Sequence, residues 1–227
     1  MILLILGRGK TGSLVAEAAR HRGHEVRVLG SKDNYNAGGL TPDSLRDVAV
    51  VIDFTTPEAV LDNIAACVHA RKNMVVGTTG WYETLPNIRE VVAQSGIGLL
   101  YASNFSIGVN VFFEIARAAA AALHHGYNGE IMERHHAQKK DAPSGTAVVI
   151  QKILRDIGGQ APEIVSLREG ETVGLHEIVL DSPNDTIRLA HDAKSRRGFA
   201  EGAVRAAEWL AGRSGFFEFR DIWRELR

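Results

Sequence analysis

The side chains best suited to acid–base chemistry gather in one short stretch, residues 133–146, which reads ERHHAQKKDAPSGT. Two adjacent imidazoles, His135 and His136, are followed closely by two ammonium groups, Lys139 and Lys140. Imidazole is the side chain best suited to proton transfer near neutral pH. In an extended segment the two rings point to opposite sides, so one of them at most faces a given ligand. We expect a functional role for at least one; the alternative is a buried structural histidine.

The same stretch ends in a turn that opens a helix. Pro143, Ser144, Gly145 and Thr146 precede an apolar run with helical spacing. The free N–H groups and the dipole of such an N-terminus attract an anion, such as a carboxylate. Ser144 is also a favourable N-cap residue, so a well-capped structural helix is the plainer interpretation, and both can hold together. We expect no metal, because adjacent histidines without cysteine or a spaced third ligand do not match zinc spacings, and Lys139 would repel a cation.

A phosphate-binding pattern opens the chain. The apolar run MILLIL predicts a buried strand, and GRGKTG follows directly. This G-x-G-x-x-G loop, residues 7–12, lies between a strand and a helix, and its candidate cofactor-binding residues are Gly7, Gly9, Lys10, Thr11 and Gly12. Its glycines allow a tight turn and close approach of the backbone to a pyrophosphate on the helix N-terminus. The alternative is a plain strand-to-helix turn. A nucleoside-triphosphate loop is excluded, because that pattern needs glycine where Leu4 lies.

The second predicted strand, residues 25–29, ends at the corner that selects the dinucleotide. An NAD-selective site usually has Asp or Glu at the end of this strand to hold the ribose hydroxyls. The corner here reads Leu-Gly-Ser-Lys-Asp, so that Ser31 and Lys32 offer a hydroxyl and a cation that suit a 2′-phosphate. We expect NADPH to be accepted at least as well as NADH. The alternative is that Lys32 is only a solvated loop residue.

Strands and helices alternate up to residue 106. Further predicted strands cover 48–54, 73–76 and 98–101, and predicted helices cover 11–22, 57–71 and 85–94. Residues 30–48 are expected to be a surface connection with at most a short helix at 43–47. The alternation predicts a Rossmann-like doubly wound parallel sheet with ligands at the carboxyl ends of its strands. Loops after the fourth and fifth strands then join the cofactor site: Gly77, Thr78, Thr79, Ser103, Asn104, Phe105 and Ser106.

The regular alternation of strands and helices ends at residue 106. The predicted elements there are an alanine-rich helix at 107–124, a strand before His135, a helix at 145–157, three strands within 163–191, a helix at 197–210, a strand at 216–219 and a short last helix. The three strands alternate in polarity, and the last two join across residues 182–185. We expect a C-terminal α+β domain with a mixed, mostly antiparallel sheet over 107–196. It follows a dinucleotide-binding domain at 1–106 and precedes a tail at 197–227.

Composition narrows the class of partner. With 26 basic and 27 acidic residues among 227, the formal charge is −1, which gives no electrostatic footprint for nucleic acid or an anionic membrane. Cys67 is the only cysteine, so no disulfide can form within the chain, and a reducing compartment is expected. The apolar start lacks a basic leader and ends at Gly7, and no other run approaches membrane-spanning length. We therefore expect a cytoplasmic protein with a small-molecule substrate.

Residues 133–147 match the pattern E-x-H-H-x-x-K-x-D-A-P-S-G-T-A at every specified position. Further similarity lies at 53–55, 77–80, 103–108, 168–170, Gly174, His176, 195–199, Gly202 and Ala203. On these residues, over essentially the whole chain, the sequence resembles the dihydrodipicolinate reductase (4-hydroxy-tetrahydrodipicolinate reductase) family of bacterial lysine and diaminopimelate biosynthesis.

The resemblance implies a role for each matching residue. His135 is similar to the proton donor, and Lys139 to a second charged group that helps polarise the substrate. The implied holders of the substrate carboxylates are His136, Ser144, Gly145 and Thr146. NADPH or NADH would reduce the cyclic dicarboxylate 4-hydroxy-tetrahydrodipicolinate to tetrahydrodipicolinate with loss of water.

The family also implies a tail that returns to the dinucleotide-binding domain and a homotetramer assembled through the second sheet. The sequence departs from the family in a compact glycine loop and in a short segment after the second strand, without the acidic residue that many members have. The preference for NADH or NADPH therefore stays open.

Two other functions remain. A related NAD(P)-dependent dehydrogenase of similar two-domain build could act on another small carboxylic acid. A nucleotide sensor or scaffold could keep the first domain without chemistry. The presence of His135, Lys139 and the Gly145-Thr146 turn argues against the sensor, which has no need of them.

Overall fold

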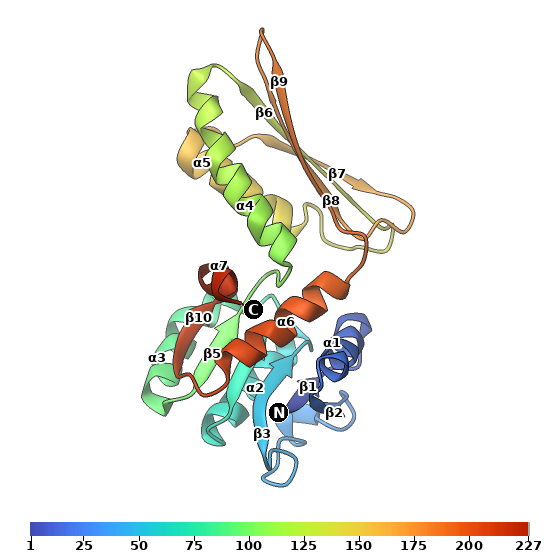
Figure 1. Ribbon diagram of the computed structural model, residues 1–227, viewed down its shortest axis with the longest axis vertical. Coiled ribbons are helices and arrows are strands. Elements are labelled where there is room, and N and C mark those ends of the chain that lie inside the picture. The colour runs from blue at the N-terminus through green and yellow to red at the C-terminus, as the bar shows by residue number, and fades with distance from the viewer. Residues whose placement is uncertain (227) are drawn as a thin grey trace. The chain divides into compact units, whose positions relative to one another are not determined.

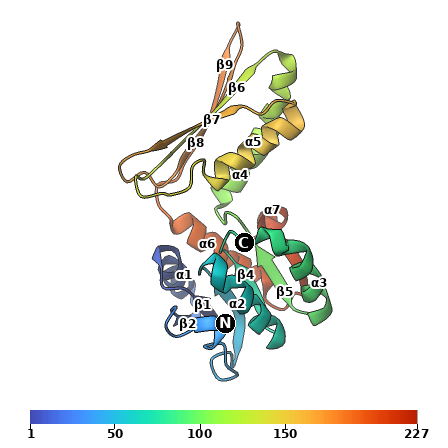
Figure 2. The same cartoon turned by 180° about the vertical axis from the view of Figure 1, so that it is seen from behind.

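The computed structural model describes residues 1–226 and divides the chain into two compact units (Figures 1 and 2). Unit 1 contains Met1–Ser106 together with the chain from Arg197 onward, and unit 2 contains Ile107–Arg196. The expected fold class is confirmed, with a Rossmann-like parallel sheet in unit 1 and a smaller mixed sheet in unit 2.

Unit 1 is built on a six-stranded sheet in the order β10-β5-β4-β3-β1-β2, with every neighbouring pair parallel. Its strands are β1 (Ile2–Leu6), β2 (Glu25–Leu29), β3 (Val48–Asp53), β4 (Asn73–Val76), β5 (Gly98–Tyr101) and β10 (Gly215–Glu218). Strands β1, β3, β4 and β5 are almost wholly buried, as continuous apolar runs in a two-sided sheet should be. The chain after unit 2 returns here, because β10 pairs with β5 at the sheet edge.

Helices cover both faces of this sheet, α1 and α6 on one and α2 and α3 on the other (Figures 1 and 2). The helices of unit 1 are α1 (Lys10–His21), α2 (Pro57–His69), α3 (Leu85–Ser95), α6 (Arg197–Leu210) and α7 (Phe219–Ile222). Pro57 begins α2 at a position where its missing N–H costs nothing. Gly96, with φ +75°, ends α3 in the left-handed conformation that glycine tolerates.

The connection after β2 differs from the prediction. At most a short helix was expected, at 43–47; those residues form turns, and the helical segment is instead the single turn η1 (Tyr35–Ala37). A 3₁₀ turn of this length leaves no periodic apolar pattern to detect. Further short turns are η2 (Tyr82–Thr84) before α3 and η4 (Trp223–Glu225) after α7.

Unit 2 packs two helices against a four-stranded sheet in the order β7-β6-β8-β9. The strands are β6 (Asn128–His135), β7 (Glu163–Arg168), β8 (Leu175–Asp181) and β9 (Thr186–Asp192). The helices are α4 (Ile107–Ala120), continued by the 3₁₀ turn η3 (Ala121–His125), and α5 (Gly145–Gly158). β6 pairs with β7 in parallel and with β8 antiparallel, which a helical crossover between β6 and β7 allows. Residues of α4, α5, β6 and β8 form its core: Phe112, Ile131, Ile150, Leu154 and Ile178.

One run corrects the expectation that no segment after the N-terminus reaches membrane-spanning length. The helical run Ile107–His125 has 19 residues and is long and apolar enough to cross a membrane by length and composition alone. Here its apolar side, including Val109, Phe112 and Ala116, is buried in the core of unit 2. The core helix of a soluble domain passes the same test, so the run is weak evidence for a membrane.

Candidate active site

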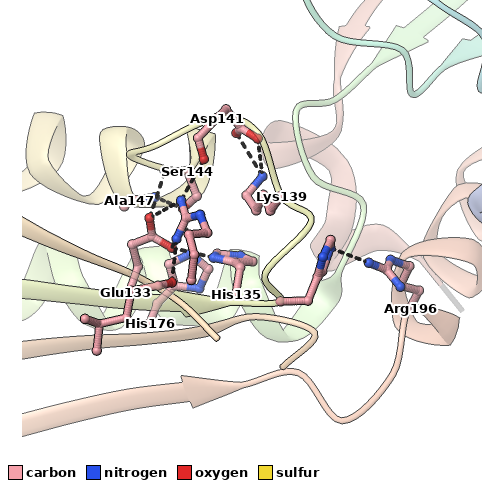
Figure 3. Close-up of polar contacts among 11 residues, drawn as sticks. Glu133, His135, Lys139, Asp141, Ser144, Ala147, His176 and Arg196 are labelled. Carbon is pink, nitrogen blue, oxygen red and sulfur yellow. Dashed lines mark hydrogen bonds and ion pairs between the residues drawn. The ribbon is translucent and has the colours of Figure 1, made fainter. Parts of the chain in front are cut away.

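The buried face of β6 is apolar at Ile131 but carries two polar side chains at its next two positions. Ile131 belongs to the core of unit 2, and Glu133 and His135 follow it at the two-residue period of a strand, so all three lie on the same buried face. Nδ1 of His135 is hydrogen-bonded to Glu133 Oε2 (Figure 3). Because an ionised carboxylate can only accept, this contact places a proton on Nδ1. Nε2 has no hydrogen-bond partner among residues 1–226.

Glu133 is fully buried and paired with Arg168 from the neighbouring strand β7. Arg168 Nη1 donates to Glu133 Oε2 at 2.9 Å, and Nη2 donates to Oε1 at 2.6 Å. Burial by itself would raise the pKa of the Glu133 carboxyl, but hydrogen bonds from Arg168, Ser166 and His135 outweigh it and lower the pKa to about 2. The carboxylate is therefore ionised at neutral pH.

The proton affinity of His135 is set by opposing neighbours. Burial is the largest cause and lowers the pKa of the ring, and the charges of Lys139 and Arg168 act in the same direction. Glu133 opposes them by hydrogen bond and charge. The result is a pKa below the ordinary histidine value, so the neutral ring is favoured more strongly than in an exposed histidine.

Lys139 lies in the loop that joins β6 to α5. Its Nζ donates to both carboxylate oxygens of Asp141, at 2.7 and 2.8 Å (Figure 3). Arg168 Nη2 also donates to the backbone carbonyl of Asp141 at 2.6 Å. Arg168 thus ties the loop to the same carboxylate that holds His135, and the ammonium group of Lys139 is held in place next to it.

Ser144 begins α5 as its N-cap and is buried. Its hydroxyl oxygen accepts a hydrogen bond from Ala147 N at 3.2 Å and lies 3.0 Å from His176 Nε2, while its backbone N–H donates to Glu133 at 3.2 Å. These contacts engage both the hydroxyl and the N–H of Ser144 and fix the start of the helix, and its predicted role in binding a substrate carboxylate stays a prediction. At Gly145 a Cβ would meet no atom within 4 Å, so the helix N-terminus is open there, with Thr146 half-buried beside it.

His136 directly follows β6 and has a partner of its own. Its Nε2 accepts a hydrogen bond from Arg196 Nη2 at 2.9 Å (Figure 3). Because Arg can only donate, this ring nitrogen carries no proton. His136 and Arg196 form a second polar pair of unit 2, separate from the pair of Glu133 and His135.

A cluster with metal-ligating potential lies in the same place. Glu133, His135 and His176 offer ligand atoms within 4.8 Å of one another, and the two imidazoles meet edge to face with their centroids 5.1 Å apart. Both oxygens of Glu133 are already bonded to the guanidinium of Arg168, whose charge opposes a cation. The donor set therefore suits an ion-paired carboxylate better than a metal.

In the glycine loop of unit 1, packing explains two of the three glycines but not Gly9. A Cβ at Gly7 would lie 2.2 Å from Phe54 O, and a Cβ at Gly12 would lie 2.2 Å from Gly7 O, so close backbone packing requires both glycines. A Cβ at Gly9 would meet nothing within 4 Å. That space at the N-terminus of α1 suits the close approach of a pyrophosphate, so the residues present fit a dinucleotide.

Two pockets of unit 1 meet at this loop. One of about 290 Å³ is lined by Gly9, Lys10, Thr11 and Gly12 and by the predicted Gly77, Thr78 and Thr79. The other, of about 760 Å³, shares Gly9 with it, and its lining also includes Gly7, Arg8, Ser31, Lys32 and Asp33. The carboxyl ends of parallel strands thus bring three separate sequence segments together, as a doubly wound sheet requires.

The loop after β5, residues 103–106, is fixed by aromatic packing and a backbone hydrogen bond. Phe105 is buried between Phe54 and Phe219, and a Cβ at Gly202 of α6 would stand 1.9 Å from its carbonyl oxygen. Asn104 Oδ1 accepts from the backbone N–H of Ser106 at 2.8 Å. Residues 103–106 do not line either of the two pockets described above, so their place in the cofactor site stays a prediction.

Two carboxylates with no role assigned from the sequence help to shape the site of unit 1. In unit 1 the buried Asp53 accepts from Thr78 Oγ1 at 2.6 Å and from Asn63 Nδ2 at 2.8 Å, and thereby shapes the loop after β4. At the corner after β2, Arg8 Nη2 lies 3.1 Å from Asp33 Oδ2, which also accepts from Gly30 N at 3.1 Å. An acidic group, Asp33, therefore does lie at this corner, three residues past Gly30, where it is paired with Arg8.

His176 is buried in unit 2, and we expect it to make the stability of this unit sensitive to acid. Burial, supported by the charge of His135, lowers the pKa of His176 to about 3, and its Nδ1 is buried without a partner among residues 1–226. A histidine held neutral in the folded state but free to protonate when unfolded costs stability once the pH falls below about 6.5. From pH 7 to pH 5 this one group should lower the free energy of unfolding by about 2 kcal/mol.

His176→Gln keeps a polar partner for Ser144 but cannot titrate. We expect this variant to lose that part of the pH dependence, measured by urea unfolding at pH 7 and pH 5 at one protein concentration. His125→Gln, at an exposed histidine of the same unit, is the control and should unfold like the parent protein at both values. An equal loss between the two pH values in His176→Gln and parent would show that His176 is not the sensitive group.

Comparison with known proteins identifies relatives over the whole chain. Residues 1–105 match the family described as dihydrodipicolinate reductase, N-terminus, and residues 108–223 match its C-terminus. The 4-hydroxy-tetrahydrodipicolinate reductase of Christiangramia forsetii is 37% identical over 100% of this chain and 99% of its own length. That of Laribacter hongkongensis is 40% identical over 76% of this chain and 72% of its own.

Solved structures give the same fold. The dipicolinate-bound dihydrodipicolinate reductase from Paenisporosarcina sp. TG-14 covers 98% of this chain and 99% of its own, with a TM-score of 0.80 and 24% identity. Aspartate dehydrogenase from Thermotoga maritima covers 92% of this chain and 96% of its own, with a TM-score of 0.54 and 15% identity. At these identities the structures support the fold alone.

Proposed function

Because this chain belongs to the dihydrodipicolinate reductase family, we propose that it reduces 4-hydroxy-tetrahydrodipicolinate to tetrahydrodipicolinate with NADPH or NADH and loss of water. The reaction is a step of lysine and diaminopimelate biosynthesis. One observation on this chain's own residues supports the proposal. His135, locked by a buried carboxylate, lies in the same segment as the ion-paired Lys139 and the open helix N-terminus at Gly145.

The residues of unit 2 divide the work on the substrate. His135 donates a proton from Nε2, since Nδ1 is engaged by Glu133. Lys139 places its ammonium charge beside the reacting ring and stabilises negative charge that develops there. The N–H groups of Gly145 and Thr146 bind a substrate carboxylate with the help of the helix dipole, and Ser144 orients them. His136, held by Arg196, binds the other carboxylate.

Unit 1 holds the cofactor, which supplies the hydride when bound. The loop at Gly7, Gly9 and Gly12 binds the pyrophosphate, with Lys10 and Thr11 at the N-terminus of α1. The nicotinamide end of the cofactor is bound by two loops, one with Gly77, Thr78 and Thr79 and the other with residues 103–106. Ser31 and Lys32 line the larger pocket and bind the adenosine ribose with its 2′ substituent.

The proposed reaction is tested by following NADPH oxidation with freshly generated 4-hydroxy-tetrahydrodipicolinate. Other cyclic imines and small keto acids serve as competing substrates in the same assay. We expect turnover with the first compound to exceed that with each competitor by a kcat/KM ratio on the order of 10² or more, because a site built to pair two carboxylates penalises ligands that leave its polar groups unpaired. Preferred turnover of another small acid would assign a related dehydrogenase instead.

Lys32→Ala tests the cofactor corner. The Lys32 side chain is exposed at the pocket rim, and a cation there stabilises a 2′-phosphate but not a 2′-hydroxyl. We expect KM for NADPH to rise about 3- to 10-fold, as for the loss of one partly exposed ion pair, with KM for NADH nearly unchanged. Steady-state kinetics with both cofactors measure this. Lys152→Ala in unit 2 is the matched control, and equal effects on both cofactors would remove Lys32 from the corner.

We propose further that the protein acts in the cytoplasm and assembles as a homotetramer through the sheet of unit 2. Helices α4 and α5 cover one face of that sheet and β9 alternates exposed and half-buried residues, so the other face is available to a second copy.

A further inference from the structure

Glu133 is a buried carboxylate in contact with two parts of the proposed chemistry. Its two oxygens accept from both terminal nitrogens of Arg168, from the backbone N–H of Ser144 and from Nδ1 of His135. One side chain on β6 thus joins the proton-donating ring to the first residue of the carboxylate-binding helix. Nothing in the family comparison assigns it a role.

We propose that Glu133 is the positioning residue of this enzyme, which fixes His135 as the Nδ1–H tautomer with Nε2 directed to substrate and aligns the N-terminus of α5 with it. This inference rests on the proposed function, because it takes His135 as the proton donor and Gly145 as the carboxylate site. Glu133 itself acts only through those residues.

Stability gives no reason for a charge at this position. The preceding inner residue of β6 is Ile131, which packs in an apolar core, and an apolar side chain at 133 would continue that pattern. Replacing a buried ion pair by apolar residues of similar volume is often neutral or stabilising. The contact with His135 supplies the reason, because an orienting carboxylate on one imidazole nitrogen dictates which nitrogen exchanges a proton with substrate.

The ring of His135 is held on its other sides as well. A Cβ at Gly174 would stand 3.0 Å from Nε2, so a larger residue there would crowd the ring in this orientation. The imidazole of His176 meets it edge to face, with an interplanar angle of 73°. With Glu133 holding Nδ1, the ring has little freedom to flip, and the flip would expose the wrong nitrogen.

The charge of Glu133 also sets the pH range of the donor. The groups that face His135 are Glu133 on its own strand, Arg168 on β7, His176 on β8 and Lys139 in the loop. Arg168 and Lys139 are cationic and His176 is neutral, so Glu133 alone favours the imidazolium. Donor activity is present below the pKa of His135 and is lost as the pH rises through it. Removing the Glu133 charge therefore moves that loss to lower pH.

Glu133→Gln is the test, because the amide fills the same volume without the charge. We expect kcat to fall about 10²- to 10⁴-fold at pH 7, as for loss of the orienting carboxylate in other histidine catalysts, with the KM for NADPH unchanged. The high-pH limb of kcat should shift to lower pH. Glu133→Asp, which keeps the charge on a shorter side chain, should recover part of kcat. Glu130→Gln, at an exposed position of the same strand, is the matched control and should behave like the parent protein.

A spectroscopic readout separates positioning from mere folding. In ¹⁵N-labelled parent protein above the pKa of His135, the side-chain shifts should show a protonated Nδ1 and an unprotonated Nε2, and Glu133→Gln should show a mixture of tautomers. An Nε2–H tautomer in the parent protein overturns the inference without any variant. So does a folded Glu133→Gln protein with unchanged kcat and pH profile. Failure of the proposed function appears instead as a parent protein that does not turn over 4-hydroxy-tetrahydrodipicolinate, whatever the tautomer.

Discussion

His135→Gln is expected to lower kcat by about 10²- to 10⁴-fold, the contribution of a positioned general acid. Glutamine can still meet the carboxylate of Glu133 through its amide N–H groups, so the buried ion pair with Arg168 stays satisfied and the fold should persist. What is lost is a group that can give up a proton at neutral pH. The KM for NADPH should change little, because the glycine loop belongs to unit 1 and His135 to unit 2.

Steady-state kinetics with saturating cofactor and varied substrate measure this effect. His125→Gln provides the control for a histidine lost from an exposed surface of the same unit. Since the proton is supplied by the enzyme, the remaining activity of His135→Gln should also lose the high-pH limb that His135 imposes on the parent protein. A kcat within threefold of the parent value would remove His135 from the reaction.

Arg168→Met should lower the free energy of unfolding by about 3–5 kcal/mol, the usual cost of leaving one partner of a buried ion pair alone. Glu133 is completely buried, and without the guanidinium its remaining donors are the backbone N–H of Ser144, the His135 imidazole and the Ser166 side chain. The pKa of Glu133 should rise as a result. The deficit should therefore shrink as the pH is lowered, because protonation relieves the uncompensated charge.

The double variant Arg168→Met with Glu133→Met separates charge from packing. With both charges gone, most of the lost stability should return, while kcat should stay low because His135 has no orienting carboxylate. Arg155→Met is the control: its pair with Asp156 is exposed on α5, and such pairs contribute about 0–1 kcal/mol. Urea unfolding at one protein concentration measures all three variants. A double variant as unstable as the single one would show that packing by Arg168, not charge pairing, holds the site.

Local patterns in the sequence were enough to predict much of the fold. The apolar run before Gly7 predicted β1, the glycine spacing predicted the start of α1, and Ser144 followed by an apolar helical period predicted the N-cap of α5. Each of these depends on residues close together in the chain, for which period, capping and turn preferences are physically sufficient. The brief turn at Tyr35–Ala37 was missed because one turn carries no period.

The contacts within the site could not be predicted from the sequence, because they depend on how the strands pair. The register of the sheet in unit 2 places Arg168 of β7 opposite His135 and His176 of β8 opposite Glu133. A signal for Glu133 was present, since it shares the strand face of Ile131 and His135, where a charge is out of place without a partner. The identity of that partner was not readable, because Arg168 lies on a strand that returns only after a helix.

The sequence by itself thus determined which chemical groups this protein has and which local elements carry them: the histidine pair, Lys139, the open turn at Gly145 and the glycine loop. Only the tertiary structure decided how they are used. It buried Ser144 as a cap, paired Arg8 with Asp33 at the cofactor corner, and joined Glu133 to His135, Arg168 and Ser144. The physical reason is that hydrogen bonds and ion pairs depend on distance in space, and sheet register, not sequence spacing, sets that distance for residues on different strands.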